Sequence, residues 1–174
     1  FSISTNNLVS TTNSSATLPN SVDLVKYFPP IGNQGKYGTC VAWAAAYNTK
    51  TAVEAMDRGY TTSQLANTQY QLSPKDLFFN ILDSQKGKSC GGTGFTSALD
   101  VLVKRGAAPL SDVPYDNLSN CASSLAQSSW DQYAKNHKIE SYRKIDVDVN
   151  TAKGYLAQNR PIVFGARLAD DFRS

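Results

Sequence analysis

The sequence has no apolar run near the ~20 residues that a transmembrane helix requires, which argues against membrane insertion. It also has no large excess of one charge, since 17 Lys and Arg against 14 Asp and Glu give a net charge of +3. Both signs are interspersed, which is typical of a solvated surface and argues against a nucleic-acid partner or a polybasic membrane patch. With one histidine and no Cys-x-x-Cys motif, the sequence has too few ligands for the usual zinc sites. We therefore expect no metal and no cofactor.

Cysteine is scarce, and the three that are present are Cys40, Cys90 and Cys121. An odd number fits one disulfide and one free thiol, which indicates an oxidising compartment and hence a secreted, periplasmic or cell-surface protein. Three buried free thiols in a cytosolic protein are the alternative. The sequence begins at Phe1 without a signal segment, so we expect either that a signal was removed or that the sequence is an expressed piece.

The sequence divides into three regions of different character. Residues 1–17 are rich in Ser, Thr and Asn, which predicts a flexible tail. Residues 18–125 carry helical patterns and are expected to form a helical lobe, whereas residues 126–174 contain the first part of a β lobe. The expected elements are helices over 39–58, from 74 to before 87, over 96–105 and over 151–158, and strands over 138–145 and 162–168.

Local signals define the ends of these helices. Gly59 is the expected C-terminal stop of the first helix. Ser73, followed by a proline and by a carboxylate three residues after the cap, begins the second helix, which carries Leu82 and three other apolar side chains to the core. Asn150 is expected to cap the last helix. Residues 61–71 are polar and are expected to form a loop.

The β lobe is unfinished in this sequence. Residues 162–166 are a continuous apolar run, the pattern of a strand covered on both faces. Two predicted strands cannot provide that cover, because an isolated pair of strands is marginal in water. We therefore infer that further polypeptide is needed to complete the β lobe.

The stretch that carries chemistry runs from Asn33 to Ala46. A glycine-spaced turn leads to Cys40 in the first turn of a helix made of small and apolar residues. The first N–H groups of a helix lack intrahelical partners and carry partial positive charge, which favours the nucleophilic thiolate. Gln34 precedes Cys40 by six residues across two glycine bends, so its amide N–H can lie beside the sulfur and donate to an oxyanion. The pattern predicts half of an acyl-transfer site.

The same stretch resembles a known family. Pro30-Ile-Gly-Asn-Gln-Gly-x-x-Gly-Thr-Cys40 resembles the Pro-Val-x-Asn-Gln-Gly-x-Cys-Gly-Ser-Cys segment of papain-type cysteine peptidases. Weaker matches follow in the family's order and extend the resemblance from Leu18 to about Phe172. They are Leu72-Ser-Pro-Lys-Asp-Leu77, Cys90-Gly-Gly92 with Ser97-Ala-Leu99, Val113-Pro-Tyr-Asp116 with Cys121, and Arg160-Pro-Ile-Val163.

The resemblance implies a papain-like two-lobe α+β fold, with the helical lobe complete and the β-sheet lobe partly present. It implies a cysteine peptidase that takes a peptide or protein substrate and uses no cofactor, with Cys40 as the nucleophile and Gln34 as the oxyanion-hole amide. From the residues alone, the glycine-rich turn at 90–94 is either a plain loop or a close approach of backbone to a ligand. By resemblance, the substrate-binding residues are Gly38, Gly92 and Thr93, with Phe95 and Gly165 near the pocket for the second residue before the cut.

The sequence departs from the family at its cysteines. Tyr37 stands where the family has the usual partner of Cys90, and Asn80 or a neighbour stands where the partner of Cys121 is expected. The resemblance therefore implies a replacement bridge between Cys90 and Cys121. After the nucleophile, a valine takes the place of the family's tryptophan, and Trp43 follows two residues later.

The catalytic His and Asn of the family lie beyond the point that matches Ser174. His137 precedes the first predicted strand, and we interpret it as a solvated loop residue. The first hypothesis is therefore one chain of a cleaved two-chain peptidase that acts through a thioester on Cys40, with His and Asn on a second polypeptide that completes the β lobe. An inactive papain-like peptide-binding module is the alternative, and a piece of a longer single chain is a third possibility.

Overall fold

The computed structural model describes residues 18–166, so the predicted tail over 1–17 and the end of the second predicted strand lie outside the described residues. Helices are the main regular structure of the described part, and no helix within it is long and apolar enough to cross a membrane. Its elements, in order, are η1 (Val25–Tyr27), α1 (Cys40–Ala42), η2 (Trp43–Lys50), α2 (Thr51–Arg58), α3 (Thr62–Leu65), η3 (Thr68–Tyr70), α4 (Pro74–Phe79), η4 (Asp83–Gln85), η5 (Lys88–Cys90), α5 (Phe95–Lys104), η6 (Ser123–Leu125), α6 (Trp130–Ala134) and α7 (Val149–Ala157).

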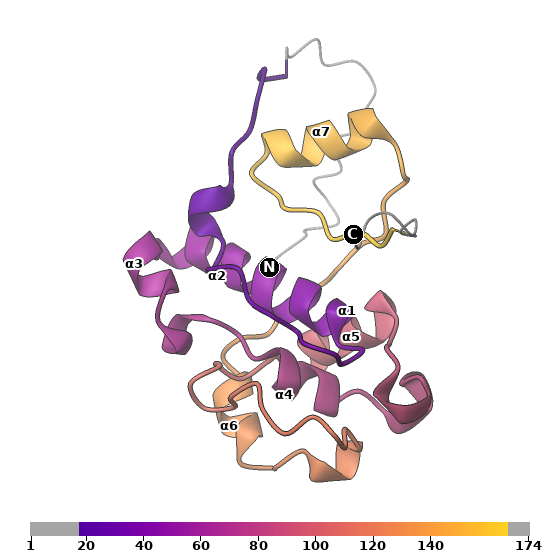
Figure 1. Cartoon of the computed structure of the whole chain (residues 1–174). Coiled ribbons are helices and arrows are strands. Elements are labelled where there is room, and N and C mark those ends of the chain that lie inside the picture. The colour runs from indigo at the N-terminus through magenta and orange to yellow at the C-terminus, as the bar shows by residue number, and fades with distance from the viewer. Residues whose placement is uncertain (1–17, 167–174) are drawn as a thin grey trace.

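One continuous helical run, made of α1, η2 and α2, forms the centre of the molecule (Figure 1). It agrees with the helix predicted over 39–58 to within one residue. Gly59 ends it in the left-handed conformation, with φ of 69°, and donates its N–H to the carbonyl of Ala55. The middle segment, η2, is π-helical, which the sequence did not indicate. Small side chains allow the other helices to approach closely, and five of its alanines are buried: Ala42, Ala45, Ala46, Ala52 and Ala55.

The helices α4 and α5 pack against this central run and complete the core. Ser73 caps α4 by accepting the N–H of Asp76 at 3.1 Å, as its sequence pattern predicted. The helix is shorter than predicted, because the Asn80 side chain donates to the carbonyl of Asp76 at 2.8 Å and closes the helix there. The prediction that Leu82 reaches the core is therefore wrong, since 61% of this residue is exposed.

A buried ion pair joins the start of α4 to the end of α5. Arg105 donates two hydrogen bonds to the carboxylate of Asp76, at 2.7 and 2.9 Å, and the N–H of Ala108 donates a third at 2.7 Å. The Asp76 side chain is fully buried. The side-chain amide of Asn80 donates a fourth hydrogen bond to it at 3.2 Å. These donors satisfy a charge that would otherwise be very costly to bury.

Two helix starts differ from the sequence predictions. Residues 61–71, expected as a loop, contain α3, which begins with a capping box in which Thr61 and Gln64 bond each other's backbone N–H. The last helix, α7, begins at Val149 and is capped by Asp148, which accepts the N–H of Thr151 at 2.7 Å. The predicted cap, two residues later, is therefore wrong.

Beyond the helical lobe, α7 and its flanking segments lie at one end of the molecule, away from α4 and α6 (Figure 1). The predicted strands over 138–145 and 162–166 form no ladder, and residues 18–166 contain only two isolated bridges. A strand needs a neighbour for its backbone hydrogen bonds, and neither segment has one within the described residues. The architecture is a complete helical lobe followed by a partial second lobe.

Candidate active site

The sulfur of Cys40 is accessible at the start of the central helical run. Cys40 is the first residue of α1, is exposed and has a free thiol. It borders a hollow of about 590 Å³ between this run and the segment 28–34. The hollow is also lined by Gln34, Trp43 and Asn48. A nucleophile must be open to its substrate, and this thiol meets that requirement.

Gln34 lies on the same hollow, so the structure brings these two predicted site residues together. Its side-chain Nε2 donates to the carbonyl of Tyr37 at 3.0 Å. A carboxamide has two N–H groups, so one remains for another acceptor. The turn that follows is set by Gly35, whose φ is 61° and whose N–H donates to Asn33 Oδ1 at 2.7 Å.

The loop that carries Gln34 is held by two tyrosine hydroxyls whose partners the sequence did not indicate. Tyr115 donates to the Gln34 carbonyl at 2.9 Å, and Tyr47 donates to the Pro30 carbonyl at 2.8 Å. Tyr115 belongs to the Val113–Asp116 motif of the family resemblance, but nothing local in the sequence indicates its distant partner. Both hydroxyls therefore hold the backbone of this loop in place.

The indole of Trp43 packs against this loop at Gly32. Its ring packs against Tyr47 and Tyr115, at centroid distances of 4.6 and 4.9 Å. A Cβ on Gly32 would lie 2.1 Å from the indole, so the loop crosses it where only glycine fits. The indole N–H is buried and has no partner among the described residues.

The predicted substrate-binding glycines meet beside the nucleophile loop. A Cβ on Gly38 would lie 2.5 Å from the carbonyl oxygen of Cys90 and 2.7 Å from the nitrogen of Gly92. Gly92 has a φ of 125°, a conformation that other residues rarely adopt. The Thr93 hydroxyl donates to the carbonyl of Gln85 at 3.0 Å and thus holds this second loop in place.

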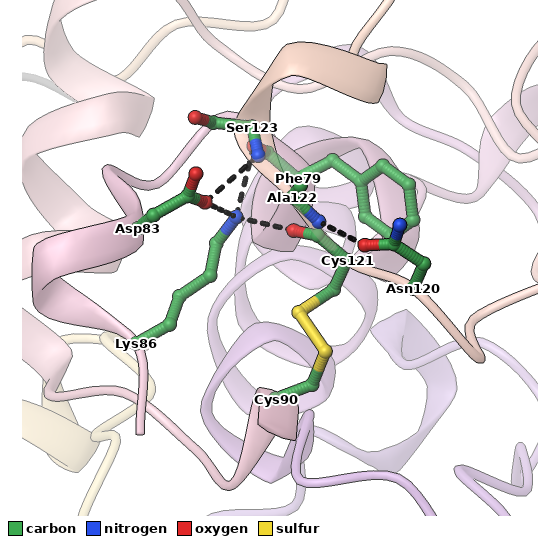
Figure 2. Close-up of a disulfide and its surroundings, with 8 residues drawn as sticks. All are labelled: Phe79, Asp83, Lys86, Cys90, Asn120, Cys121, Ala122 and Ser123. Carbon is green, nitrogen blue, oxygen red and sulfur yellow. Dashed lines mark hydrogen bonds and ion pairs between the residues drawn. A yellow bond between two sulfur atoms is a disulfide. The ribbon is translucent and has the colours of Figure 1, made fainter. Parts of the chain in front are cut away.

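A disulfide between Cys90 and Cys121 anchors the second loop, with 6.0 Å between the two Cα atoms (Figure 2). Figure 2 also shows Lys86, whose ammonium donates to the carbonyl of Cys121 at 2.6 Å and pairs with Asp83 at 3.2 Å. Burial lowers the pKa of Lys86, although Asp83 opposes this effect. Ser89 and Cys90 both have positive φ, at 50° and 62°, so the disulfide lies beside a strained stretch of backbone.

Phe95 and Gly165, the two residues expected near one substrate pocket, face each other. A Cβ on Gly165 would lie 3.6 Å from the Phe95 ring. Phe95 also lines a second hollow, of about 390 Å³, between the central run and residues 139–163.

His137 lies far from Cys40, against the other half of the central run. Its Nδ1 lies 2.9 Å from an oxygen of Glu54, and the ammonium of Lys50 lies 2.6 Å from the other oxygen. Glu54 follows Cys40 by 14 positions along the run, which separates them by roughly 20 Å at about 1.5 Å per residue. The interpretation of His137 as a solvated loop residue is wrong, because its side chain is only 14% exposed.

Glu54 is the anionic centre of this buried cluster. Burial raises the pKa of Glu54, but the hydrogen bond with His137 and the charge of Lys50 outweigh burial and hold it below its ordinary value. The histidine is thus part of a structural cluster around Glu54, and it does not line the Cys40 hollow.

Known proteins resemble this chain in fold and in sequence family. The chain is similar in fold to xylellain, a cysteine protease from Xylella fastidiosa, with a TM-score of 0.63 and 24% sequence identity. The match covers 82% of the chain and 55% of xylellain, so the chain spans about half the length of that protein. No curated protein matches the chain. The family model of papain family cysteine proteases matches residues 18–174, and the chain therefore belongs to the papain family of cysteine proteases.

Proposed function

We propose that the chain is the nucleophile-bearing part of a peptidase that hydrolyses peptide bonds through a thioester on Cys40. The observation that carries this proposal is that an exposed thiol and the Gln34 carboxamide line one hollow. The backbone of the loop around Gly92 lies directly beside the loop that leads to Cys40. A substrate backbone on that edge would lie close to the sulfur.

The reaction follows from these groups. The Cys40 thiolate attacks the peptide carbonyl, a C–S bond forms, and the carbonyl electrons move to oxygen. The free N–H of Gln34 and the backbone N–H of Cys40 donate to that oxyanion. As the C–N bond breaks, the amine leaves with a proton from an imidazolium. Water then attacks the thioester, gives up a proton to the imidazole, and releases the acid and the thiolate.

The imidazole has to come from elsewhere, because His137 is engaged with Glu54 on the far part of the central run. We propose that a second polypeptide supplies His and Asn and completes the β lobe. This is supported by the segments 138–145 and 162–166, which have no strand partners within residues 18–166. A disulfide fits an oxidising compartment, which supports a secreted, periplasmic or cell-surface location.

A peptide-binding module that does not cut is the second candidate function. It is favoured by one observation, that no histidine among the described residues lies at the Cys40 hollow. The two candidates differ in whether peptide bonds are turned over, since both would bind a peptide beside Gly92.

The test is hydrolysis of a fluorogenic peptide amide by the protein from its natural source. Intact-mass analysis of the same sample shows whether a second polypeptide accompanies the chain. Cys40→Ala should abolish turnover with the fold intact, and Gln34→Ala should lower the rate by roughly 10²-fold. Turnover that survives Cys40→Ala contradicts the proposal, and a reactive thiol without any turnover favours the binding module.

A further inference from the structure

The hydroxyl of Tyr115 connects the two residues that flank the nucleophile site. It lies 2.9 Å from the Gln34 carbonyl oxygen and is also hydrogen-bonded to the hydroxyl of Thr39. A carbonyl only accepts, so the Tyr115 hydrogen goes to Gln34 and the Thr39 hydroxyl donates to the Tyr115 oxygen. A directed chain of hydrogen bonds therefore runs from the residue before Cys40 to the backbone of Gln34.

The side chain of Thr39 is used in an unusual way. Thr39 is the N-cap of α1 and is fully buried. A threonine in this position usually accepts a backbone N–H from the first turn, but the Thr39 side chain makes no capping hydrogen bond. Its hydroxyl is directed to Tyr115 instead. The Thr39 hydroxyl therefore does not cap the helix and instead links the residue before the nucleophile to the Gln34 loop.

The ring of Tyr115 is fixed independently of its hydroxyl. It packs edge-on against Trp43, with ring centroids 4.9 Å apart, and against Tyr37 at 6.5 Å. Tyr115→Phe keeps these ring contacts and removes only the two hydrogen bonds. The role of the hydroxyl can therefore be separated from that of the ring.

We propose that Tyr115 is a positioning residue whose hydroxyl sets the place of Gln34 relative to Cys40, and so the strength of the oxyanion hole. Tyr115 does not line the hollow around Cys40 and acts through the Gln34 carbonyl and the Thr39 side chain. The inference rests on the proposed function, because it takes Cys40 as nucleophile and Gln34 as oxyanion donor.

Two thiol probes separate positioning from general damage. With acetyl-phenylalanyl-glycinal, the Cys40 sulfur bonds to the aldehyde carbon and the aldehyde oxygen takes up a proton, so that the hemithioacetal oxygen lies where the oxyanion forms. With iodoacetamide, the sulfur displaces iodide and needs no oxyanion donor. Cys40 is the one cysteine outside the disulfide, so both probes report on the same atom.

Tyr115→Phe should weaken aldehyde binding roughly threefold to tenfold and leave the iodoacetamide rate unchanged. Thr39→Val should act in the same direction, and the double variant should be no worse than the more affected single variant, because both changes cut one chain. Tyr60→Phe is the matched control. It removes a hydroxyl from another edge-on ring pair with the same 4.9 Å centroid distance, formed with Tyr70, and it should change neither probe.

Three results would overturn the inference. They are unchanged aldehyde affinity in Tyr115→Phe, equal losses with both probes, and fully additive losses in the double variant with Thr39→Val. A failure of the proposed function looks different, since the aldehyde would then not bind wild-type protein or would bind Cys40→Ala equally well. Thermal unfolding of each variant shows that its fold is retained.

Discussion

Gly38→Ala tests whether the loop before Cys40 and the loop after Cys90 must touch through their backbones. A Cβ on Gly38 would lie 2.5 Å from the carbonyl oxygen of Cys90, 2.6 Å from the carbonyl carbon of Gly91 and 2.7 Å from the nitrogen of Gly92. Ordinary contact begins near 3.4 Å, so the nearest pair must separate by about 0.9 Å (3.4 minus 2.5). All three atoms are backbone, so no side-chain rotation relieves the overlap.

The expected cost follows from that shift. A misplacement of about 1 Å in a reacting geometry can cost about 10²-fold in rate. Gly38→Ala should therefore lower kcat/KM for a peptide amide by about 10²-fold, or ~2.7 kcal/mol of transition-state stabilisation. Gly94→Ala is the control in the opposing loop after Cys90, since Gly94 has an ordinary φ of −88° and a Cβ there meets nothing within 4 Å.

The assay measures kcat and KM for the chain together with the polypeptide proposed to supply the imidazole, and acetyl-phenylalanyl-glycinal affinity for the chain alone. Gly38→Ala should impair both, whereas Gly94→Ala should impair neither. Wild-type kinetics in Gly38→Ala, at an unchanged melting temperature, would contradict this prediction, because the site would then work equally well with the two loops forced apart.

Three further predictions concern stability. Replacing Cys90 and Cys121 together by Ala should lower the free energy of unfolding by about 3–4 kcal/mol, because the bridge closes a loop of 31 residues. Chemical denaturation measures this loss, and equal stability of the variant and the wild type would contradict the prediction. Glu54 has a lowered folded pKa, so its stabilisation is complete above its ordinary value of 4.5 and is lost as pH falls through the folded value. The melting temperature of wild type should therefore fall more steeply below pH 5 than that of Glu54→Gln. Arg105→Leu should lower the free energy of unfolding by about 3–5 kcal/mol, because it leaves the buried Asp76 without its cation. A smaller loss, measured by urea unfolding, would indicate that Asp76 takes up a proton instead.

The helical lobe was predictable where local signals repeat along the chain. The helix over 40–58 stops at Gly59, and Ser73 caps the start of α4, as the sequence indicates. The helix α3 was missed although Thr61-x-x-Gln64 is a capping-box pattern, because four residues show too little apolar periodicity to stand out in a polar stretch. The capping residues predict the position of so short a helix better than its hydrophobic periodicity does.

The site was predictable only in part, for a physical reason. Cys40 and Gln34 are six residues apart, so the turn between them is a local property. The partner of His137 is Glu54, 83 residues away, and no local pattern carries that pairing. The same holds for Tyr115, whose bond to Gln34 spans 81 residues.

The second lobe shows the limit of arguments from residue pattern. Residues 162–166 have the composition of a buried strand, and they form none within the described residues. A strand exists only when another strand takes its backbone hydrogen bonds, so composition fixes what the segment prefers and not what it pairs with.

The loops beside Cys40 are held in place by residues outside the site, which explains why so few side chains form the site itself. The two loops meet at Gly38 and Gly92. A side chain on Gly38 would overlap the backbone of the other loop, and Gly92 has a φ of 125° that other residues rarely adopt, so these two positions provide no side-chain packing between the loops. Their positions are instead imposed from outside, by the hydroxyl of Tyr115 on one loop and by the disulfide of Cys90 on the other. Glycine-rich loops have high conformational entropy when free, so each anchor stabilises its loop by restricting the loop's conformations as well as through its own bond. Losing either anchor should therefore disturb substrate geometry before it unfolds the lobe.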